Sequence, residues 1–432
     1  MEPSTSKRND MQVFERNESE VRSYCRSFPA KFEKASGYTM WDVEGKAYLD
    51  FFAGAGALNY GHNPPEMKRK LMAYLAEDGI SHTLDMASRA KEDFLSRFSR
   101  IILKPRGLDY KVMFPGPTGT NSVESALKLA RKVTARQTVM GFTNAFHGMT
   151  LGALAVTGNK FKRGGAGVPL HHAVSMPYDG YLGSDINTLD YIESYLKDSG
   201  SGISLPAAII VETLQGEGGI HVASDQWLKG LASICKRYGM LLIVDDVQMG
   251  CGRTGPFFSF ERSGIVPDIV CLSKSIGGYG LPMALTLIKP ELDKWKPGEH
   301  NGTFRGNNLA FVAASEALNY WQTGRFEEEI GEKARFLSGE LENMTREFPG
   351  LNGERRGLGL MQGIAFEPGM ADRISRLAFE RGLIMETSGT DSEVIKIMPP
   401  LTIDREGLKR GLGLLEECLV ELVDEKRALL AH

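Results

Sequence analysis

Two short apolar runs, each closely followed by a charged residue, constrain the possible fold of this chain most strongly. The runs 241–244 and 269–272 are rich in Ile, Val and Leu and lie between turn residues, which is typical of strands in a parallel sheet buried on both faces. Asp245 ends the first run, and Ser273 and Lys274 follow the second. Because ligands of open α/β sheets bind beyond the carboxyl ends of the strands, the sequence predicts a carboxylate and an amine in one crevice.

Asp245 and Lys274 suit the chemistry of an aldehyde cofactor. A lysine beside an apolar strand end is partly desolvated, which favours its neutral, nucleophilic form. Such a lysine can hold pyridoxal 5′-phosphate as a Schiff base while an aspartate faces the protonated pyridine nitrogen. Strands also end in charged residues at ordinary surfaces, so this pair alone leaves both readings open.

A cluster of small residues at the predicted start of a helix is the second feature. Thr118, Gly119 and Thr120 follow a Pro-Gly-Pro turn and precede apolar residues at helical spacing. Free N–H groups and the helix dipole favour an anion there, so a phosphate fits, with an ordinary helix cap as the alternative. Phe146, just before His147, is a weaker candidate, because an aromatic ring can stack on a pyridine ring.

Six motifs, occurring in the family's order, resemble the class III (ω-amino) aminotransferases of the pyridoxal-phosphate-dependent transferase fold type I. They are residues 117–131, 146–148, 211–219, 245–255, 273–274 and 302–307. The resemblance covers nearly the whole chain. It implies an α/β fold in which a large domain, with a mostly parallel mixed sheet flanked by helices, joins a smaller α+β domain.

The same resemblance implies roles for single residues around the cofactor. Lys274 would hold the cofactor and shuttle protons, and Asp245 would pair with the ring nitrogen. The other residues implied at the cofactor are Gln248 at the ring oxygen, Phe146 on the ring face, Gly119 and Thr120 at the phosphate, and Glu212 nearby. Thr303 would reach the phosphate of the neighbouring subunit, which makes a homodimer, or a dimer of dimers, the active unit.

Three residues depart from the family pattern. Asp246 replaces a glutamate, Arg305 replaces a glycine and adds a cation, and Lys396 replaces an arginine that grips a substrate carboxylate in many members. A lysine offers a point charge and lacks the planar guanidinium group that binds a carboxylate through two parallel hydrogen bonds. We therefore expect Lys396 or Arg305 to bind the carboxylate, with Glu217 pairing with one of them when no substrate is bound. The alternative is that Lys396 faces solvent.

Further stretches resemble the L-2,4-diaminobutyrate:2-oxoglutarate aminotransferases, especially those of ectoine biosynthesis. They are residues 54–63, 103–111, 115–121, 297–307 and 385–389. Those enzymes transfer an amino group from L-glutamate to L-aspartate 4-semialdehyde, giving L-2,4-diaminobutyrate and 2-oxoglutarate. Alternatives are ornithine, acetylornithine or 4-aminobutyrate aminotransferases, a semialdehyde aminomutase, or a diaminobutyrate transaminase of another pathway. Lys396 argues against the first two.

Length and composition limit the remaining classes. At 432 residues the chain exceeds one ordinary core, and we expect an N-terminal segment 1–65 joining the small domain, a large cofactor-binding domain 66–325 and a C-terminal small domain 326–432.

A net charge of −3 lacks the excess of positive charge that is typical of nucleic-acid-binding proteins, and no apolar run is long enough for a membrane span. Five cysteines without metal-ligand spacing predict a reduced cytoplasmic protein without a metal site.

Two other classes of protein fit less well. A regulatory module that binds the cofactor without turnover generally carries a DNA-binding segment, and none is visible here. A nucleotide-binding dehydrogenase needs a Gly-x-Gly-x-x-Gly turn after an early strand, but the Gly-Ala-Gly at 54–56 lacks the third glycine and the helix start.

Overall fold

The computed structural model describes residues 10–430, and its largest element is a seven-stranded sheet. In spatial order its strands are β4 (Lys111–Met113), β12 (Leu285–Ile288), β11 (Ile269–Leu272), β10 (Leu241–Asp245), β7 (Ala208–Val211), β5 (Val139–Phe142) and β6 (Ala173–Met176). Only β12 runs antiparallel to its neighbours in this sheet. The mixed, mostly parallel sheet flanked by helices confirms the predicted α/β fold class.

Alternating side chains of the central strands enter different apolar clusters on the two faces. Ile243 packs with α6 (Gly119–Thr134) on one face. Leu242 and Val244 belong to the cluster that contains α10 (Asp225–Tyr238) on the other face. The strands are therefore buried on both sides, which explains why their sequences are continuously apolar rather than alternating. The shorter helices of this part are α7 (Leu151–Ala155), α8 (Lys160–Gly164) and α9 (Thr188–Lys197), with the two-stranded ribbon β8 (Leu214–Gln215) and β9 (His221–Val222).

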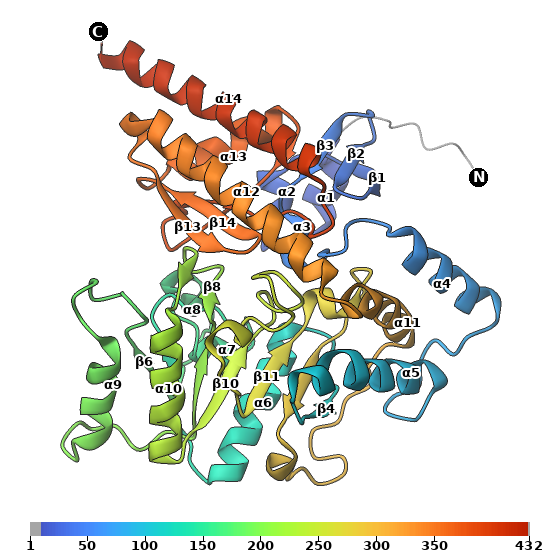
Figure 1. The fold of residues 1–432 in the computed structure, drawn as a ribbon, viewed down its shortest axis with the longest axis vertical. Helices are drawn as coiled ribbons and strands as arrows, with labels where there is room; N and C mark the ends of the chain where they lie inside the picture. The colour runs from blue at the N-terminus through green and yellow to red at the C-terminus, as the bar shows by residue number, and fades with distance from the viewer. Residues whose placement is uncertain (1–9, 431–432) are drawn as a thin grey trace.

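N-terminal and C-terminal segments of the described chain together form a second region, at the top of Figure 1. One sheet has the order β1 (Phe32–Ser36), β2 (Thr39–Asp42), β3 (Ala47–Asp50) and β15 (Leu383–Ile384). A second, antiparallel sheet has the order β13 (Glu354–Leu358), β14 (Met361–Ala365), β17 (Val394–Ile397) and β16 (Glu386–Ser388). The helices here are α12 (Arg325–Glu347), α13 (Met370–Glu380) and α14 (Arg405–Leu430). Because β15 pairs with β3, N-terminal and C-terminal segments share one sheet.

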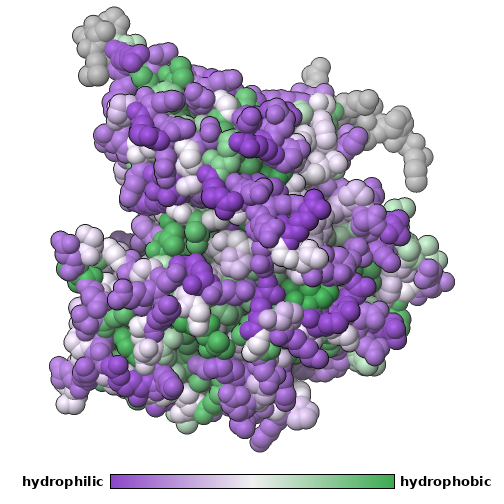
Figure 2. Space-filling model, viewed as in Figure 1, coloured by the Kyte–Doolittle hydropathy of each residue, from purple (hydrophilic) through white to green (hydrophobic). Residues whose placement is uncertain are grey.

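The remaining helices lie at the N-terminus and beside the large sheet. They are α1 (Gln12–Asn17), α2 (Tyr24–Ser27), α3 (Ala53–Gly56), α4 (Pro65–Ala76), α5 (Arg89–Arg97) and α11 (Asn308–Ala317), of which α4 and α5 pack on α11. None of the described helices is long and apolar enough to cross a membrane. Figure 2 shows a mainly hydrophilic face with scattered hydrophobic patches, one of them near the junction of the upper and lower regions.

Candidate active site

The carboxyl ends of β10 and β11 bring Asp245 and Lys274 to one cavity. Asp245 is the last residue of β10 and lies opposite Cys271 of β11, and Lys274 follows two residues after that strand ends. Both residues line a cavity of about 180 Å³. The full lining is Gly119, Thr120, Phe146, His147, Gly148, Glu212, Glu217, Asp245, Val247, Gln248, Met249 and Lys274. Lys274 has a φ of 50°, a left-handed conformation that is uncommon for a side chain of this size and is found mainly at functional sites.

Burial controls the charge of Lys274. Loss of solvent lowers the pKa of its ammonium, and the cation Lys396 lowers it further, against the opposing effect of Glu217. The neutral amine is thereby favoured, as the strand-end position predicts. A neutral amine in a cavity can attack a carbonyl carbon and can accept a proton.

Asp245 is held in place by His147. The Nδ1 atom of this histidine lies 2.7 Å from Asp245 Oδ2, and the backbone N–H of Val247 donates to Oδ1 at 3.1 Å. Burial opposes the charged form of His147, but its hydrogen bond to Asp245 and the nearby carboxylates raise its pKa. His147 Nε2 is buried and has no hydrogen-bond partner among residues 10–430. The carboxylate therefore has a fixed direction and a partner that balances its charge.

The N-terminus of α6 forms one wall of the cavity. A Cβ atom on Gly119 would lie 2.7 Å from Val247 Cγ1, so a larger residue would push on that wall. The Thr120 hydroxyl lies 2.7 Å from the hydroxyl of Thr150, beside the cavity. Thr118 caps the helix instead: its hydroxyl donates to Asn121 Oδ1 at 2.8 Å, and it does not line the cavity. The free N–H groups of this first turn can bind an anion.

Phe146, Glu212 and Gln248 complete this side of the cavity. The ring of Phe146 is half-buried, with Lys162 Nζ 4.0 Å from its centroid, and its backbone N–H donates to Glu212 Oε2 at 3.0 Å. Burial raises the pKa of Glu212 to about 8. The amide of Gln248 donates to Glu217 Oε1 at 3.0 Å and to the carbonyl of Ala55 at 3.1 Å. The structure thus gathers these predicted residues around Lys274.

Lys396 is fully buried, so the alternative in which it faces solvent is wrong. Its Nζ lies 2.8 Å from Glu217 Oε1 and 2.6 Å from Glu386 Oε2. Burial alone would raise the pKa of Glu217, but Lys396 and Lys274 bring it down to about 2. Burial would lower the pKa of Lys396, and the two glutamates raise it instead. Glu217 therefore stands, fully ionised, at the cavity with Lys396 behind it.

Thr303 and Arg305 lie elsewhere in this chain. Thr303 is exposed on the loop before α11. Arg305 lines a different cavity, of about 270 Å³, and donates to the carbonyl of Phe114 at 3.2 Å. A single chain does not bring either residue to Lys274.

The contacts of two residues of the site were not predicted from the sequence, although both residues lie in segments noted there. His147 follows Phe146 in its motif, but nothing in the sequence pairs it with Asp245, which is 98 positions away. Glu386 lies within 385–389, a stretch noted only for its resemblance. Its signal was the turn-forming Gly389-Thr390-Asp391-Ser392, which predicts a hairpin that puts Glu386 beside Lys396.

Known proteins resemble this chain over nearly its whole length. A family model described as aminotransferase class-III matches residues 22–419. Diaminobutyrate--2-oxoglutarate transaminases from Halalkalibacterium halodurans and Virgibacillus pantothenticus are 61% and 63% identical over 422 and 408 residues, which cover 98% and 94% of this chain and 99% and 98% of theirs. An ornithine aminotransferase from Toxoplasma gondii, whose structure has pyridoxal phosphate at partial occupancy in its active site, superposes with a TM-score of 0.83 at 25% identity, covering 96% of this chain and 95% of its own.

Proposed function

The chain belongs to the class III aminotransferases, and we propose that it transfers an amino group from L-glutamate to L-aspartate 4-semialdehyde, giving L-2,4-diaminobutyrate and 2-oxoglutarate. The geometry that carries this proposal is a deprotonatable Lys274 facing the Asp245–His147 pair and the N-terminus of α6 in one cavity. The choice of substrates is supported by the relatives at 61% and 63% identity.

Pyridoxal 5′-phosphate fits the residues present. The buried Asp245 suits a protonated ring nitrogen, the first turn of α6 with Gly119 and Thr120 suits the phosphate, and Lys274 suits the aldehyde. Phe146, Gln248 and Glu212 would line the ring. When bound, this cofactor supplies an aldehyde that captures the substrate amine and a ring that accepts electrons from the adjacent carbon.

The chain itself supplies proton transfer and charge. Lys274 Nζ, whose pKa is lowered by burial, would accept a proton from the reacting carbon of the substrate and deliver it to the carbon that becomes bonded to the transferred amino group. Asp245 keeps its negative charge directed at the cavity because His147 and the N–H of Val247 bind both of its oxygens.

Carboxylate recognition falls to Lys396 and Glu217. Glutamate carries a carboxylate on its reacting carbon, whereas the terminal carbon of diaminobutyrate carries only an amine. Glu217 lines the cavity and Lys396 lies behind it, so a carboxylate reaches Lys396 when Glu217 gives way. With diaminobutyrate, Glu217 stays on Lys396 and no buried cation is left unpaired.

A homodimer, or a dimer of dimers, completes the site with Thr303 of a second copy. Apolar side chains near this loop support the proposal: Phe304 is 67% exposed, and Met72, Ile80 and Met86 are more than half exposed. The rings of Phe304 and His82 lie 5.4 Å apart, so the loop and the 80–86 segment form one surface. A surface with such apolar exposure is typical of a subunit interface.

The reaction fits a cytoplasmic step of ectoine biosynthesis. All five cysteines are free and four of them are buried, which suits a reducing compartment. Ornithine, acetylornithine and 4-aminobutyrate aminotransferases remain the alternatives within the family, and they differ in the semialdehyde that accepts the amino group.

A purified-enzyme assay tests the proposal. The protein, loaded with pyridoxal phosphate, is supplied with glutamate and, in separate reactions, with the semialdehydes of aspartate, glutamate, N-acetylglutamate and succinate. We expect aspartate 4-semialdehyde to be preferred, with diaminobutyrate identified by chromatography and mass, and Lys274→Ala to show no turnover. Preference for another semialdehyde would overturn the substrate assignment, and an active Lys274→Ala would overturn the site.

A further inference from the structure

Lys396 is bound by two carboxylates that come from different parts of the chain. Lys396 lies on β17, and Glu386 on β16 is its direct cross-strand neighbour. Glu217 lies in the loop after β8. Within the described side chains, no other cation lies within ion-pair distance of either glutamate. One ammonium therefore serves two carboxylates, and the two are not equivalent.

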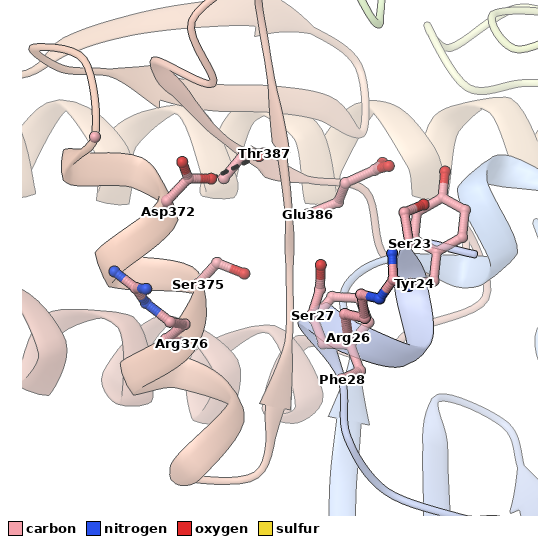
Figure 3. A pocket seen from close by; sticks show the side chains of 11 residues that line it. Ser23, Tyr24, Arg26, Ser27, Phe28, Asp372, Ser375, Arg376, Glu386 and Thr387 are labelled. Atoms are coloured by element: carbon pink, nitrogen blue, oxygen red, sulfur yellow. Dashed lines mark hydrogen bonds between the residues drawn. The ribbon is translucent and has the colours of Figure 1, made fainter. Parts of the chain in front are cut away.

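The two glutamates face opposite sides. Glu217 lines the cavity of Lys274, where it also accepts from Gln248. Glu386 lines a separate cavity of about 500 Å³ between α2 and α13, and its side chain extends toward Tyr24 (Figure 3). Tyr24 and Glu386 line this cavity together, and burial and the charge of Glu386 raise the pKa of the Tyr24 hydroxyl, which favours its protonated form beside the carboxylate. Glu386 does not line the cavity of Lys274. A substrate bound in that cavity therefore does not displace Glu386 from Lys396.

A lysine needs such an anchor more than an arginine would. The guanidinium group of arginine is planar and preorganised for a carboxylate, whereas an ammonium is a point charge on a flexible four-carbon stem. With Glu217 as its single partner, Lys396 would follow that carboxylate when it moves, or would remain buried and unpaired at a large cost in free energy. A second, fixed carboxylate removes both difficulties.

We propose that Glu386 is a positioning residue for the carboxylate of glutamate and 2-oxoglutarate: it holds Lys396 in place, still paired, while Glu217 exchanges with the substrate. This inference rests on the proposed function. It explains how a lysine can stand where other family members have an arginine. It also predicts that Glu386 matters for only one half of the reaction, because the terminal carbon of diaminobutyrate has no carboxylate.

The first test compares Glu386→Gln with the wild-type holoenzyme. We expect KM for glutamate and for 2-oxoglutarate to rise about tenfold, the loss expected for one charge-assisted contact, with kcat and the KM for diaminobutyrate nearly unchanged. Glutarate, a dicarboxylate without an amine, should bind more weakly by a similar factor in calorimetry. Glu380→Gln, an exposed glutamate at the end of α13, is the matched control and should change neither value.

A double-mutant cycle separates positioning from a general structural effect. If Glu386 acts through Lys396, Glu386→Gln in a Lys396→Met background should cause no further rise in KM for glutamate. This double variant removes both Lys396 and the charge of Glu386, leaving Glu217 as the one charged member of the group, and it remains informative if the single Glu386→Gln protein does not fold. Additive losses, or an equal rise in KM for glutamate and diaminobutyrate, would overturn the inference. A wild-type enzyme that does not use diaminobutyrate at all would overturn the proposed function instead.

Discussion

Two buried ionic groups contribute residues to the lining of the Lys274 cavity, and they are built differently. Asp245 and His147 both belong to the region of the seven-stranded sheet, and both oxygens of Asp245 are bound. The group around Lys396 joins two strands of the C-terminal sheet to a loop of the other region, through Glu217. The first group lies within one region, whereas in the proposed function a substrate carboxylate replaces Glu217 in the second group.

This difference assigns separate tasks to the two sides. A carboxylate fixed within one region keeps a constant charge and direction, which suits a cofactor that stays in place. An ion group shared between regions can exchange a partner at small cost as long as its buried cation keeps another. Under the proposed function, the chemistry lies on the rigid side, with Asp245 and His147, and the discrimination between substrates lies on the exchangeable side, with Glu217 and Lys396.

Asp245→Asn should give the largest effect, because it removes the constant charge. We expect kcat to fall at least about a hundredfold, while the fold is retained, since the amide is isosteric but cannot balance a ring cation. Steady-state rates and circular dichroism measure the two properties. Near-normal activity would show that Asp245 does not carry this role and would break the comparison.

Lys396→Met should affect one substrate only. We expect kcat/KM for glutamate to fall roughly ten- to hundredfold, the loss of about 1.5–3 kcal/mol for a charge-assisted hydrogen bond, with diaminobutyrate much less affected. Arg305→Met is the comparison variant, because within one chain Arg305 lines another cavity. If Arg305→Met gives the larger loss, the carboxylate is bound from the subunit interface and not from β17.

Thr303→Val should weaken cofactor retention several-fold without changing the charge on either side of the cavity. The expected cause is loss of one hydroxyl donor to the phosphate of the other subunit. Dialysis followed by absorbance measures retention, and dilution that separates subunits should act in the same direction. Thr323→Val, at another exposed position, is the control. Full cofactor occupancy in a demonstrable monomer would contradict a shared site.

The smallest effect concerns Asp246, which follows Asp245 but does not line the cavity. Burial raises the pKa of Asp246 to about 7 in the folded protein, whereas an unfolded aspartate titrates near pH 4. Between these values the folded state binds the extra proton, so this group's contribution to stability is present at low pH and is lost as pH rises toward 7, by at most about 1.4 kcal/mol per pH unit.

Urea unfolding at pH 5 and pH 7 checks this prediction. The urea concentration at the unfolding midpoint should fall for wild type between pH 5 and pH 7, because Asp246 loses its proton. The midpoint of Asp246→Asn should therefore be higher relative to wild type at pH 7 than at pH 5, because the amide does not ionise. Asp78→Asn, at an exposed position, should keep a constant difference from wild type. A constant difference for Asp246→Asn as well would contradict the raised pKa.

The sequence predicted the rigid side better than the exchangeable side, for a physical reason. Asp245 and Lys274 end neighbouring apolar strands, and parallel strands deliver their ends to one edge, so local patterns suffice. Lys396 was recognised as a departure, but its environment depends on the register of β16 and β17 and on a loop 179 positions earlier in the chain. The turn at 389–392 indicates the hairpin that brings Glu386 to Lys396, but packing between distant segments brings Glu217 there, and no local pattern records that contact.

The pairing of β3 with β15 has a consequence for how the chain is made. Leu49 lies opposite Leu383, so the N-terminal strands leave the ribosome long before their partner strand has been synthesised. At roughly 5–20 residues per second, this delay lasts on the order of 20 to 70 seconds. During that time the free edge of β3 is exposed to other nascent chains. Chaperone depletion during synthesis should therefore lower the yield of soluble protein more than the same depletion after synthesis has ended.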